Sequence, residues 1–198
     1  GSGADLVSVC LVSEELAKAS PAFAGMLTVQ MVLCPKTVEI LGTEEQKRRL
    51  LPASASGERL MAYSQSEPGG AANIAAHLTR ALPEGNGWRL DGSKLFCTQG
   101  TAKTVLVMCK TQDRDGNSGY GCVIVNSDDD GFTALPHERK LGWRGTSTGP
   151  LIWGRRTFLA TSCPAAFPTA RPPPPIFWRI APCRSAARRA CSTGRWIR

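Results

Sequence analysis

Near the start of the chain, apolar residues recur at steps of three and four, the spacing of a helix with one apolar face. The pattern predicts an amphipathic helix from Asp5 to Ala19, which ends at Ser20-Pro21 because proline does not continue a helix. A mostly apolar stretch from Ala22 to about Cys34 predicts a second helix, buried between other helices. A short helix that stops near Gly42 is expected next.

A further helix is predicted to begin at Thr43. Thr43 and Gln46 have the spacing of a capping box, and Glu44 and Glu45 suit the positive end of the helix dipole. After Gly57 the helical spacing gives way to extended runs bounded by polar or glycine-containing loops. The chain is therefore expected to pass from a helical part to a β part close to this glycine.

The extended runs are short and several are rich in Val, as expected for strands. Asp91-Gly92, flanked by such residues, is typical of a tight hairpin turn. The predicted strands are Arg59–Gln65, Asn73–Leu82, Trp88–Phe96, Val105–Cys109, Cys122–Val125 and Phe132–Leu135. The expected fold class is α+β, a helical part followed by an antiparallel, barrel-like β domain.

Composition changes this picture only at one end of the chain. The 198 residues include 24 Lys and Arg against 16 Asp and Glu, a net charge of +8. Gly154–Arg198 holds nine Arg and no Lys, Asp or Glu, so a basic nucleic-acid binder is an interpretation of the last 45 residues only. The 42% hydrophobic content excludes full disorder, and no run approaches the roughly 20 apolar residues of a membrane span.

The eight cysteines form no Cys-x-x-Cys pair, and neither His77 nor His137 lies close to a cysteine in the sequence. Because zinc sites show such spacing, no metal site is expected, and the thiols are predicted to be reduced and mostly buried. The sequence also lacks the commonest nucleotide-binding glycine motifs and the nucleophile elbow of serine hydrolases. Those functions therefore have no support.

The segment from Leu60 to Asn73, LMAYSQSEPGGAAN, is chemically informative. In it, an apolar strand runs into Glu67-Pro68 and then into a loop of small residues. Small side chains and free amides let a backbone approach a large ligand or an anion closely. Taken alone, however, a Glu-Pro-Gly-Gly sequence is far more often an ordinary turn.

Segments on both sides of this loop decide between the two interpretations. They are Leu41–Lys47, Leu51-Pro52, Ser56–Glu58, Leu90–Gly100, Gly131-Phe132 and Lys140–Thr148. In this order and at these intervals, the set resembles the acyl-CoA dehydrogenase family of flavoproteins. The resemblance covers roughly Gly1 to Trp153.

The resemblance implies a helical N-terminal domain, a middle β domain and a C-terminal helical bundle, with FAD held between the last two. Residues 1–55 correspond to part of the first domain, and residues 56–153 to the middle domain, which would bind flavin and acyl-CoA. Residues 154–198 form an aberrant Arg-, Pro- and Ala-rich tail that we expect to be disordered. The chain is thus expected to be truncated at both ends and to lack the bundle.

In the family, the strand before Glu-Pro follows the pyrimidine edge of the flavin, which implies contacts from Tyr63, Gln65 and Ser66. Ser66 stands where Thr is usual and keeps the hydroxyl. The next loop has Ala71 and Ala72 where the family usually shows Gly and Ser, so a hydroxyl that helps to hold the flavin diphosphate is absent. A lost hydrogen bond to a charged group costs about 1.5–3 kcal/mol, although backbone amides remain available.

Phe96, Cys97 and Thr98 match the family's Trp-x-Thr segment behind the flavin, where the Thr98 hydroxyl would reach the ring nitrogen that accepts hydride. The implied reaction is α,β-dehydrogenation of an acyl-CoA, in which a carboxylate takes the α-proton and FAD takes the β-hydride. The family places that carboxylate in the bundle. No catalytic residue is therefore assigned in this chain, which is expected to be inactive.

By the same resemblance, the partners are an acyl-CoA substrate and an electron-transfer flavoprotein or a similar acceptor. Intact relatives would be homo-oligomers. The expected location is a bacterial-type cytoplasm, with a mitochondrial matrix as the alternative, and neither a specific nucleic-acid partner nor a membrane span is expected. Two alternative functions stay open. One is an acyl-CoA oxidase, and the other is a non-catalytic module whose basic tail binds nucleic acid or acidic surfaces.

Two hypotheses explain the tail. It is either a functional basic arm or the product of a shifted reading frame, because GC-rich DNA read out of frame is rich in Arg, Pro and Ala. Written in G/C-favouring codons and shifted, Thr157–Ala166 can be read as VPGDILPGG. That peptide resembles the loop that the family has at this point, which favours the frame hypothesis.

Overall fold

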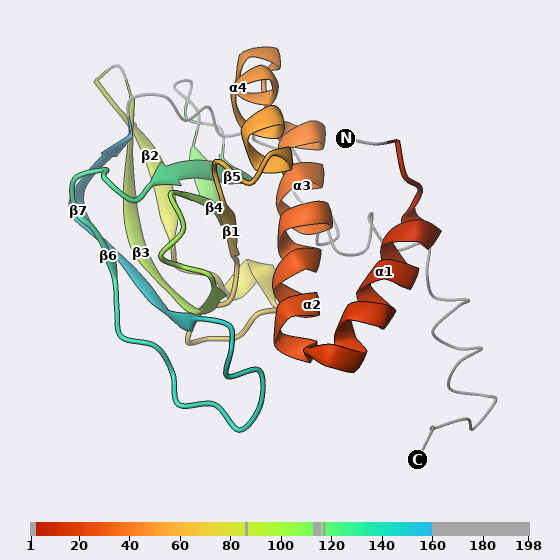
Figure 1. Ribbon diagram of the computed structural model, residues 1–198. Coiled ribbons are helices and arrows are strands. Elements are labelled where there is room, and N and C mark those ends of the chain that lie inside the picture. The colour runs from red at the N-terminus through yellow and green to blue at the C-terminus, as the bar shows by residue number, and fades with distance from the viewer. Residues whose placement is uncertain (1–2, 86, 113–115, 117, 160–198) are drawn as a thin grey trace.

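The computed structural model describes residues 3–85, 87–112, 116 and 118–159. Residues 160–198, which make up most of the tail predicted to be disordered, lie outside the described residues. Helices come first and strands follow, as the sequence predicts (Figure 1). The helices are α1 (Leu6–Ala19), α2 (Pro21–Thr28), the π-helical turn η1 (Val29–Leu33), α3 (Cys34–Leu41) and α4 (Glu44–Ala55).

The second and third predicted helices are one continuous helix from Pro21 to Leu41, which corrects the predicted break near Cys34. Pro35 accounts for its irregular middle, because proline lacks an N–H and its ring clashes with the carbonyl four residues back. The helix widens just before this proline into η1, where the Cys34 N–H bonds to the Val29 carbonyl.

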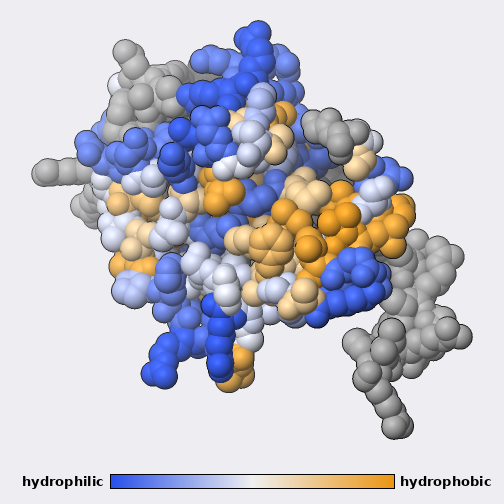
Figure 2. All heavy atoms as spheres, in the orientation of Figure 1, coloured by the Kyte–Doolittle hydropathy of each residue, from blue (hydrophilic) through white to orange (hydrophobic). Residues whose placement is uncertain are grey.

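This long helix is less buried than its composition predicts. Cys34 and Val38 are buried against the sheet, but Phe23 is 45% and Met31 43% exposed, and apolar side chains gather on the surface over α1 and α2 (Figure 2). By length and composition alone the helix could cross a membrane, so the expectation that no segment qualifies is wrong. Core helices of water-soluble proteins can have the same length and composition.

Side-chain caps set the helix starts. The Asp5 carboxylate accepts the Ser8 N–H at 2.8 Å and begins α1, which confirms the first predicted helix. The capping box of α4 is also confirmed. The Gln46 N–H donates to Thr43 Oγ1 at 3.2 Å, and the Thr43 N–H donates to Gln46 Oε1 at 2.9 Å.

Within the described residues, seven strands form one curled sheet with the order β1-β4-β2-β3-β7-β6, and β5 pairs with β4 as well (Figure 1). The strands are β1 (Met61–Ser64), β2 (Arg80–Glu84), β3 (Gly87–Thr98), β4 (Thr104–Gln112), β5 (Ser118–Asn126), β6 (Phe132–Ala134) and β7 (Thr148–Leu159), with a 3-10 turn η2 (Ile74–Ala76) between β1 and β2.

The predicted β domain is confirmed. Its sheet is mixed rather than purely antiparallel, because β1 and β2 run parallel to β4. β7 also continues past residue 154, so the predicted tail begins in extended backbone.

β1 and β2 lie one after the other along the same edge of β4. Met61–Ser64 pair with Thr104–Val107, and Arg80-Ala81 pair with Lys110-Thr111. The opposite edge of β4 pairs along its whole length with β5. The segment 65–79 therefore leaves the sheet and returns to it, and this excursion contains the Glu-Pro loop.

Two predicted extended segments differ in the structure. The turn η2 interrupts the predicted strand Asn73–Leu82, which becomes extended only in β2. Asp91-Gly92 lies inside β3, at an irregularity in its pairing with β7, and the hairpin reverses between Glu84 and Gly87 instead. Gly92 has a φ of 140°, and a Cβ there would lie 2.6–2.8 Å from atoms of Thr79. Glycine thus serves a bulge and a close backbone approach, not a turn.

Around β4 and β5 both faces of the sheet are buried, because successive side chains of a strand point to opposite faces. In β4, Val105, Val107 and Cys109 belong to the core inside the curl, together with Trp153. Leu106 and Met108 face the helices, which contribute Cys34, Val38 and Leu50. The predicted buried strands around Val105–Cys109 and Cys122–Val125 are thereby confirmed.

Candidate functional site

One edge of β1 is not paired with another strand among the described residues. In a strand, both main-chain groups of one residue point to one edge of the strand and those of the next residue point to the other edge. The Gln30 side chain binds both main-chain groups of Met61, and the Cys97 thiol lies 3.6 Å from the Tyr63 carbonyl. Met61 and Tyr63 therefore share the edge that faces away from β4, and we call this edge the free edge of β1.

The end of β3 lies beside this free edge. Cys97 is buried there, whereas the Phe96 side chain is 62% exposed. Phe96 has a φ of 55°, which is an unfavourable backbone conformation for a bulky residue. Such strained conformations are often found at binding sites. Thr98 is half-buried and pairs with Thr148 of β7. The segment Phe96–Thr98 thus brings an aromatic ring and a hydroxyl next to β1.

A buried carboxylate anchors the Glu-Pro loop from inside. Glu67 accepts hydrogen bonds from the Lys94 ammonium at 2.8 Å, from the Thr79 N–H at 3.1 Å and from the Leu78 N–H. The Lys94 side chain is 0% and that of Glu67 4% exposed. The loop is therefore joined to β3 by an ion pair shielded from water.

The same lysine sets the direction of the next peptide group. The Lys94 ammonium donates to the Gln65 carbonyl at 2.9 Å, and the Leu95 N–H donates to the Ser66 carbonyl at 2.8 Å. In a trans peptide the C=O and the following N–H point in opposite directions. The Ser66 N–H is thus turned away from Lys94.

The charges of this pair follow from its contacts. Burial by itself would raise the pKa of Glu67, but the hydrogen bonds from Lys94, Leu78 and Thr79 lower this pKa to about 2. Burial lowers the pKa of Lys94, and the ion pair with Glu67 opposes that shift. Glu67 is ionised at neutral pH with its oxygens occupied, so it holds the loop and does not act as a base.

His77 ties the far side of the loop to β5. Its Nδ1 lies 2.8 Å from the Tyr120 hydroxyl, and its Nε2 lies 3.2 Å from the Gly70 carbonyl. Burial, followed by the charge of Lys94, lowers the pKa of His77, so the ring is neutral at pH 7. Because a carbonyl can only accept, Nε2 carries the proton and donates to Gly70, and Nδ1 accepts from Tyr120.

The structure brings most of the sequence-predicted site residues together. The Tyr63 hydroxyl donates to Gln65 Oε1 at 2.9 Å, and the Gln65 amide donates to the Ala71 carbonyl at 3.1 Å. Ala71 and Ala72 are exposed on the loop. Through Cys97 and Leu95, the group joins Phe96 and Thr98 of β3. The roles of these residues toward a cofactor stay predictions, and the anchoring groups Glu67, Lys94, His77, Tyr120 and Gln30 were not predicted from the sequence.

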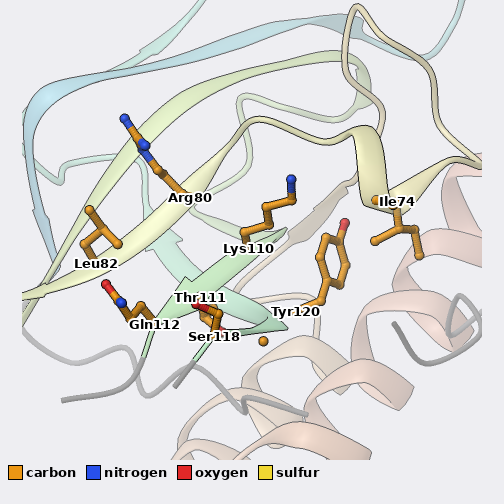
Figure 3. Close-up of a pocket in the computed structure, with 10 residues that line it drawn as sticks. Ile74, Arg80, Leu82, Lys110, Thr111, Gln112, Ser118 and Tyr120 are labelled. Carbon is orange, nitrogen blue, oxygen red and sulfur yellow. The ribbon is translucent and has the colours of Figure 1, made fainter. Parts of the chain in front are cut away.

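A groove of about 370 Å³ opens beside the loop, between β2 and the β4–β5 pair (Figure 3). Arg80 and Lys110 give it positive charge, and Ile74 and Leu82 give it apolar surface. Tyr120 lines the groove and also binds His77, which links the groove to the Glu-Pro loop. The site therefore combines a free strand edge, a pinned loop and a basic groove.

Four of the five described cysteines, Cys34, Cys97, Cys109 and Cys122, are buried free thiols, which confirms that prediction for them. Burial raises the pKa of Cys97 to about 11 and that of Cys109 to about 12. These thiols stay protonated at neutral pH. Across the described ranges, no group of three His, Cys, Asp or Glu could hold a metal ion.

Comparison with known proteins agrees with this architecture. Residues 1–58 match the N-terminal domain of acyl-CoA dehydrogenases, and residues 62–154 match the middle domain. A probable acyl-CoA dehydrogenase of Mycobacterium tuberculosis is 37% identical over 154 residues, which are 77% of this chain and 39% of that relative. The chain thus spans about two fifths of such relatives.

Solved structures show the same half. A glutaryl-CoA dehydrogenase from Mycobacterium smegmatis in complex with FADH2 is 31% identical with a TM-score of 0.75, over 83% of this chain and 42% of that one. The electron transferring flavoprotein structure of Acidaminococcus fermentans also matches, at 30% identity and a TM-score of 0.71, over 82% and 44%. The helices and curled sheet are those of the N-terminal and middle domains of a flavoprotein oxidoreductase. This chain belongs to the acyl-CoA dehydrogenase family.

Proposed function

We propose that this chain provides one side of the FAD and acyl-CoA site of an acyl-CoA dehydrogenase. The observation that carries the proposal is the free edge of β1 beside the Phe96–Thr98 segment. A flavin pyrimidine ring presents carbonyl acceptors, which suit main-chain N–H donors such as that of Tyr63 on this edge. The hydroxyls of Ser66 and Thr98 add donors on either side.

The chain's residues fit FAD by their chemistry. Tyr63 offers its free-edge N–H, since its carbonyl accepts from the Cys97 thiol, the Ser66 N–H is turned away from Lys94, and the exposed Phe96 ring offers an aromatic face. The exposed small-residue loop at 69–72 leaves room for backbone amides to approach a diphosphate. Bound FAD would supply the acceptor for the β-hydride of the substrate.

The basic groove suits the charged end of an acyl-CoA. Coenzyme A carries a diphosphate and a further phosphate, and Arg80 and Lys110 line the groove beside apolar surface from Ile74 and Leu82. We assign the groove to the nucleotide part of the substrate, whose thioester would then reach past the Glu-Pro loop.

Proton abstraction is not assigned to this chain. Glu67 is the buried carboxylate at the described site, and it is committed to Lys94 and two backbone amides. Because Glu67 is committed in this way, we propose that another carboxylate takes the α-proton in the complete enzyme. We propose that the chain is a binding-competent and inactive fragment, and that an electron-transfer flavoprotein or, for an oxidase, oxygen accepts the electrons in the complete enzyme.

Side-chain replacements test the binding proposal. Titration of the full chain with FAD, followed by quenching of flavin fluorescence, is expected to give saturable one-to-one binding. Thr98→Val and Ser66→Ala each weaken it by about tenfold, because each removes one hydrogen bond. Phe132→Leu in β6 serves as a control at the other end of the sheet. Equal affinities for all four proteins would contradict the assignment.

The tail supports the frame hypothesis. The family match ends at residue 154, where the composition becomes Arg-, Pro- and Ala-rich. We propose that a shifted frame begins close to this residue. Sequencing the source gene past the codon of Arg198 and translating it in three frames decides the matter. A second frame that continues into amphipathic helices is expected, and its absence would make the basic arm a feature of the protein.

A further inference from the structure

The side chain of Gln30 acts as a neighbouring strand for one residue of β1. Its Oε1 accepts the Met61 N–H at 3.0 Å, and its Nε2 donates to the Met61 carbonyl. A second proton on Nε2 serves Gln99 Oε1 at 2.6 Å. One amide thus satisfies both groups of Met61 and reaches the turn that follows Thr98.

The π turn places this amide. Gln30 lies in η1 (Val29–Leu33), just ahead of Pro35, where the helix is widened. Single π turns occur often at functional sites, because the extra residue redirects the side chains around it. Gln30 is half-buried between the helix and the sheet. The helix therefore meets β1 through a directed polar contact as well as through apolar packing.

Gln99, the second partner of the Gln30 amide, is itself held in place. It is 8% exposed and has a φ of 59°, so its backbone is held in a left-handed conformation. The Gln99 N–H donates to the Ser147 carbonyl at 2.9 Å, and its own carbonyl accepts the Ala102 N–H at 2.8 Å. Because Gln99 is held in place, the backbone of the preceding residue, Thr98, is held in place as well.

We propose that Gln30 is a positioning residue for the flavin-binding edge. It closes the Met61 half of the free edge, so that the Tyr63 N–H is the group left open to a ligand there, and it holds the turn after Thr98 at a set distance from that N–H. The inference rests on the proposed function, because it takes Tyr63 and Thr98 as the flavin contacts. Gln30 itself need not touch the flavin.

Two variants of the full chain test this. Gln30→Met keeps the length of the side chain and removes its hydrogen bonds, whereas Gln30→Glu keeps an acceptor for the Met61 N–H and loses both donors. Met31→Ala, at a 43% exposed neighbour in the same turn, is the matched control. Hydrogen exchange of the FAD-free protein reports the segments 60–66 and 98–102, and FAD titration reports the affinity and the flavin absorption spectrum.

We expect Gln30→Met to raise exchange in both segments and to leave 105–109 of β4 unchanged. In Gln30→Met, FAD affinity falls about tenfold and the flavin absorption bands shift. The affinity of Gln30→Glu lies between those of Gln30→Met and the wild type, and Met31→Ala matches the wild type. Unchanged exchange in the two segments would overturn the inference. So would faster exchange with unchanged affinity and spectrum, since Gln30 would then be structural only.

Failure of the proposed function has a separate signature. If the wild-type chain shows protected Met61 and Gln99 amides yet binds no FAD, the proposed function is wrong, and the assignment of Gln30 to a flavin site is overturned with it. If the wild type binds FAD and Gln30→Met binds it equally well with the same spectrum, the proposed function stands and the inference alone is wrong.

Discussion

Lys94 and Glu67 form an ion pair of 2.8 Å between two side chains that are almost completely shielded from water. The pair joins β3 to a loop that starts 27 residues earlier in the chain. Two backbone amides complete the surroundings of the carboxylate. A buried pair with satisfied partners fixes geometry more than it adds net stability.

Removal of one partner should therefore be costly. Lys94→Met leaves the Glu67 charge buried and unpaired, and we expect a loss of about 3–5 kcal/mol in the free energy of unfolding. The double variant Lys94→Met with Glu67→Gln recovers part of this loss, because no uncompensated charge remains. Urea denaturation followed by circular dichroism measures both.

The exposed pair of Lys18 and Glu15 provides the control. Lys18→Met is expected to leave the urea midpoint unchanged, since exposed ion pairs contribute little. If Lys94→Met behaves like Lys18→Met, or if the double variant is the least stable of all, the pair does not anchor the loop as described.

Acid should weaken the fold through Glu67. Its pKa is lowered from 4.5 to about 2, so its contribution to stability is complete above pH 4.5 and is lost as the pH falls toward 2. This contribution is on the order of 3 kcal/mol. In Glu67→Gln the dependence of the urea midpoint between pH 4.5 and 2 becomes shallower. An identical dependence in both proteins would show that the carboxylate is not held by its partners.

Gly92 should tolerate no side chain. Gly92→Ala places a Cβ 2.6–2.8 Å from Thr79, at a φ of 140°. We expect destabilisation by at least about 2 kcal/mol, measured as a shift in the urea midpoint. Gly69→Ala, where a Cβ would meet nothing within 4 Å, is the control and stays within about 0.5 kcal/mol of the wild type.

Gly25 should be needed for the contact between α2 and the loop around Trp143. A Cβ at Gly25 would lie 2.3 Å from the Trp143 ring, and the Thr146 hydroxyl donates to the Ala22 carbonyl at 2.8 Å beside it. Gly25→Ala is therefore expected to displace the ring and shift its tryptophan fluorescence to longer wavelength. The shift should be absent when Trp143→Leu is the background, and its persistence there would assign it to another tryptophan.

The parts of the fold that were predicted correctly depend on residues that are close together in the sequence. The capping box at Thr43 and Gln46 joins residues three apart, and the burial of β4 on both faces follows from its continuous apolar run. Asp91-Gly92 misled the prediction, because the same dipeptide serves a turn or a bulge. The close approach of Thr79 to Gly92 favours the bulge, and this contact joins residues that are not neighbours in the sequence.

The candidate site was predictable only where motifs mark it. Tyr63, Ser66 and Thr98 were found through the resemblance of their segments to a family. Nothing local distinguishes Lys94 from a surface lysine or Gln30 from a polar helix residue, because their partners lie 27 and 31 residues away. The parallel pairing of β1 with β4 was missed for the same reason.

The flavin site is tested most directly when FAD is mapped onto the chain by NMR. Amide shifts of the full-length, isotope-labelled protein are recorded while FAD is added. A flavin site at this edge predicts saturating shifts concentrated at residues 63–66 and 96–98, with little change at 132–134 of β6. Shifts elsewhere only, or no saturable shifts in a folded sample, would contradict the claim that the free edge of β1 and the end of β3 form a flavin site.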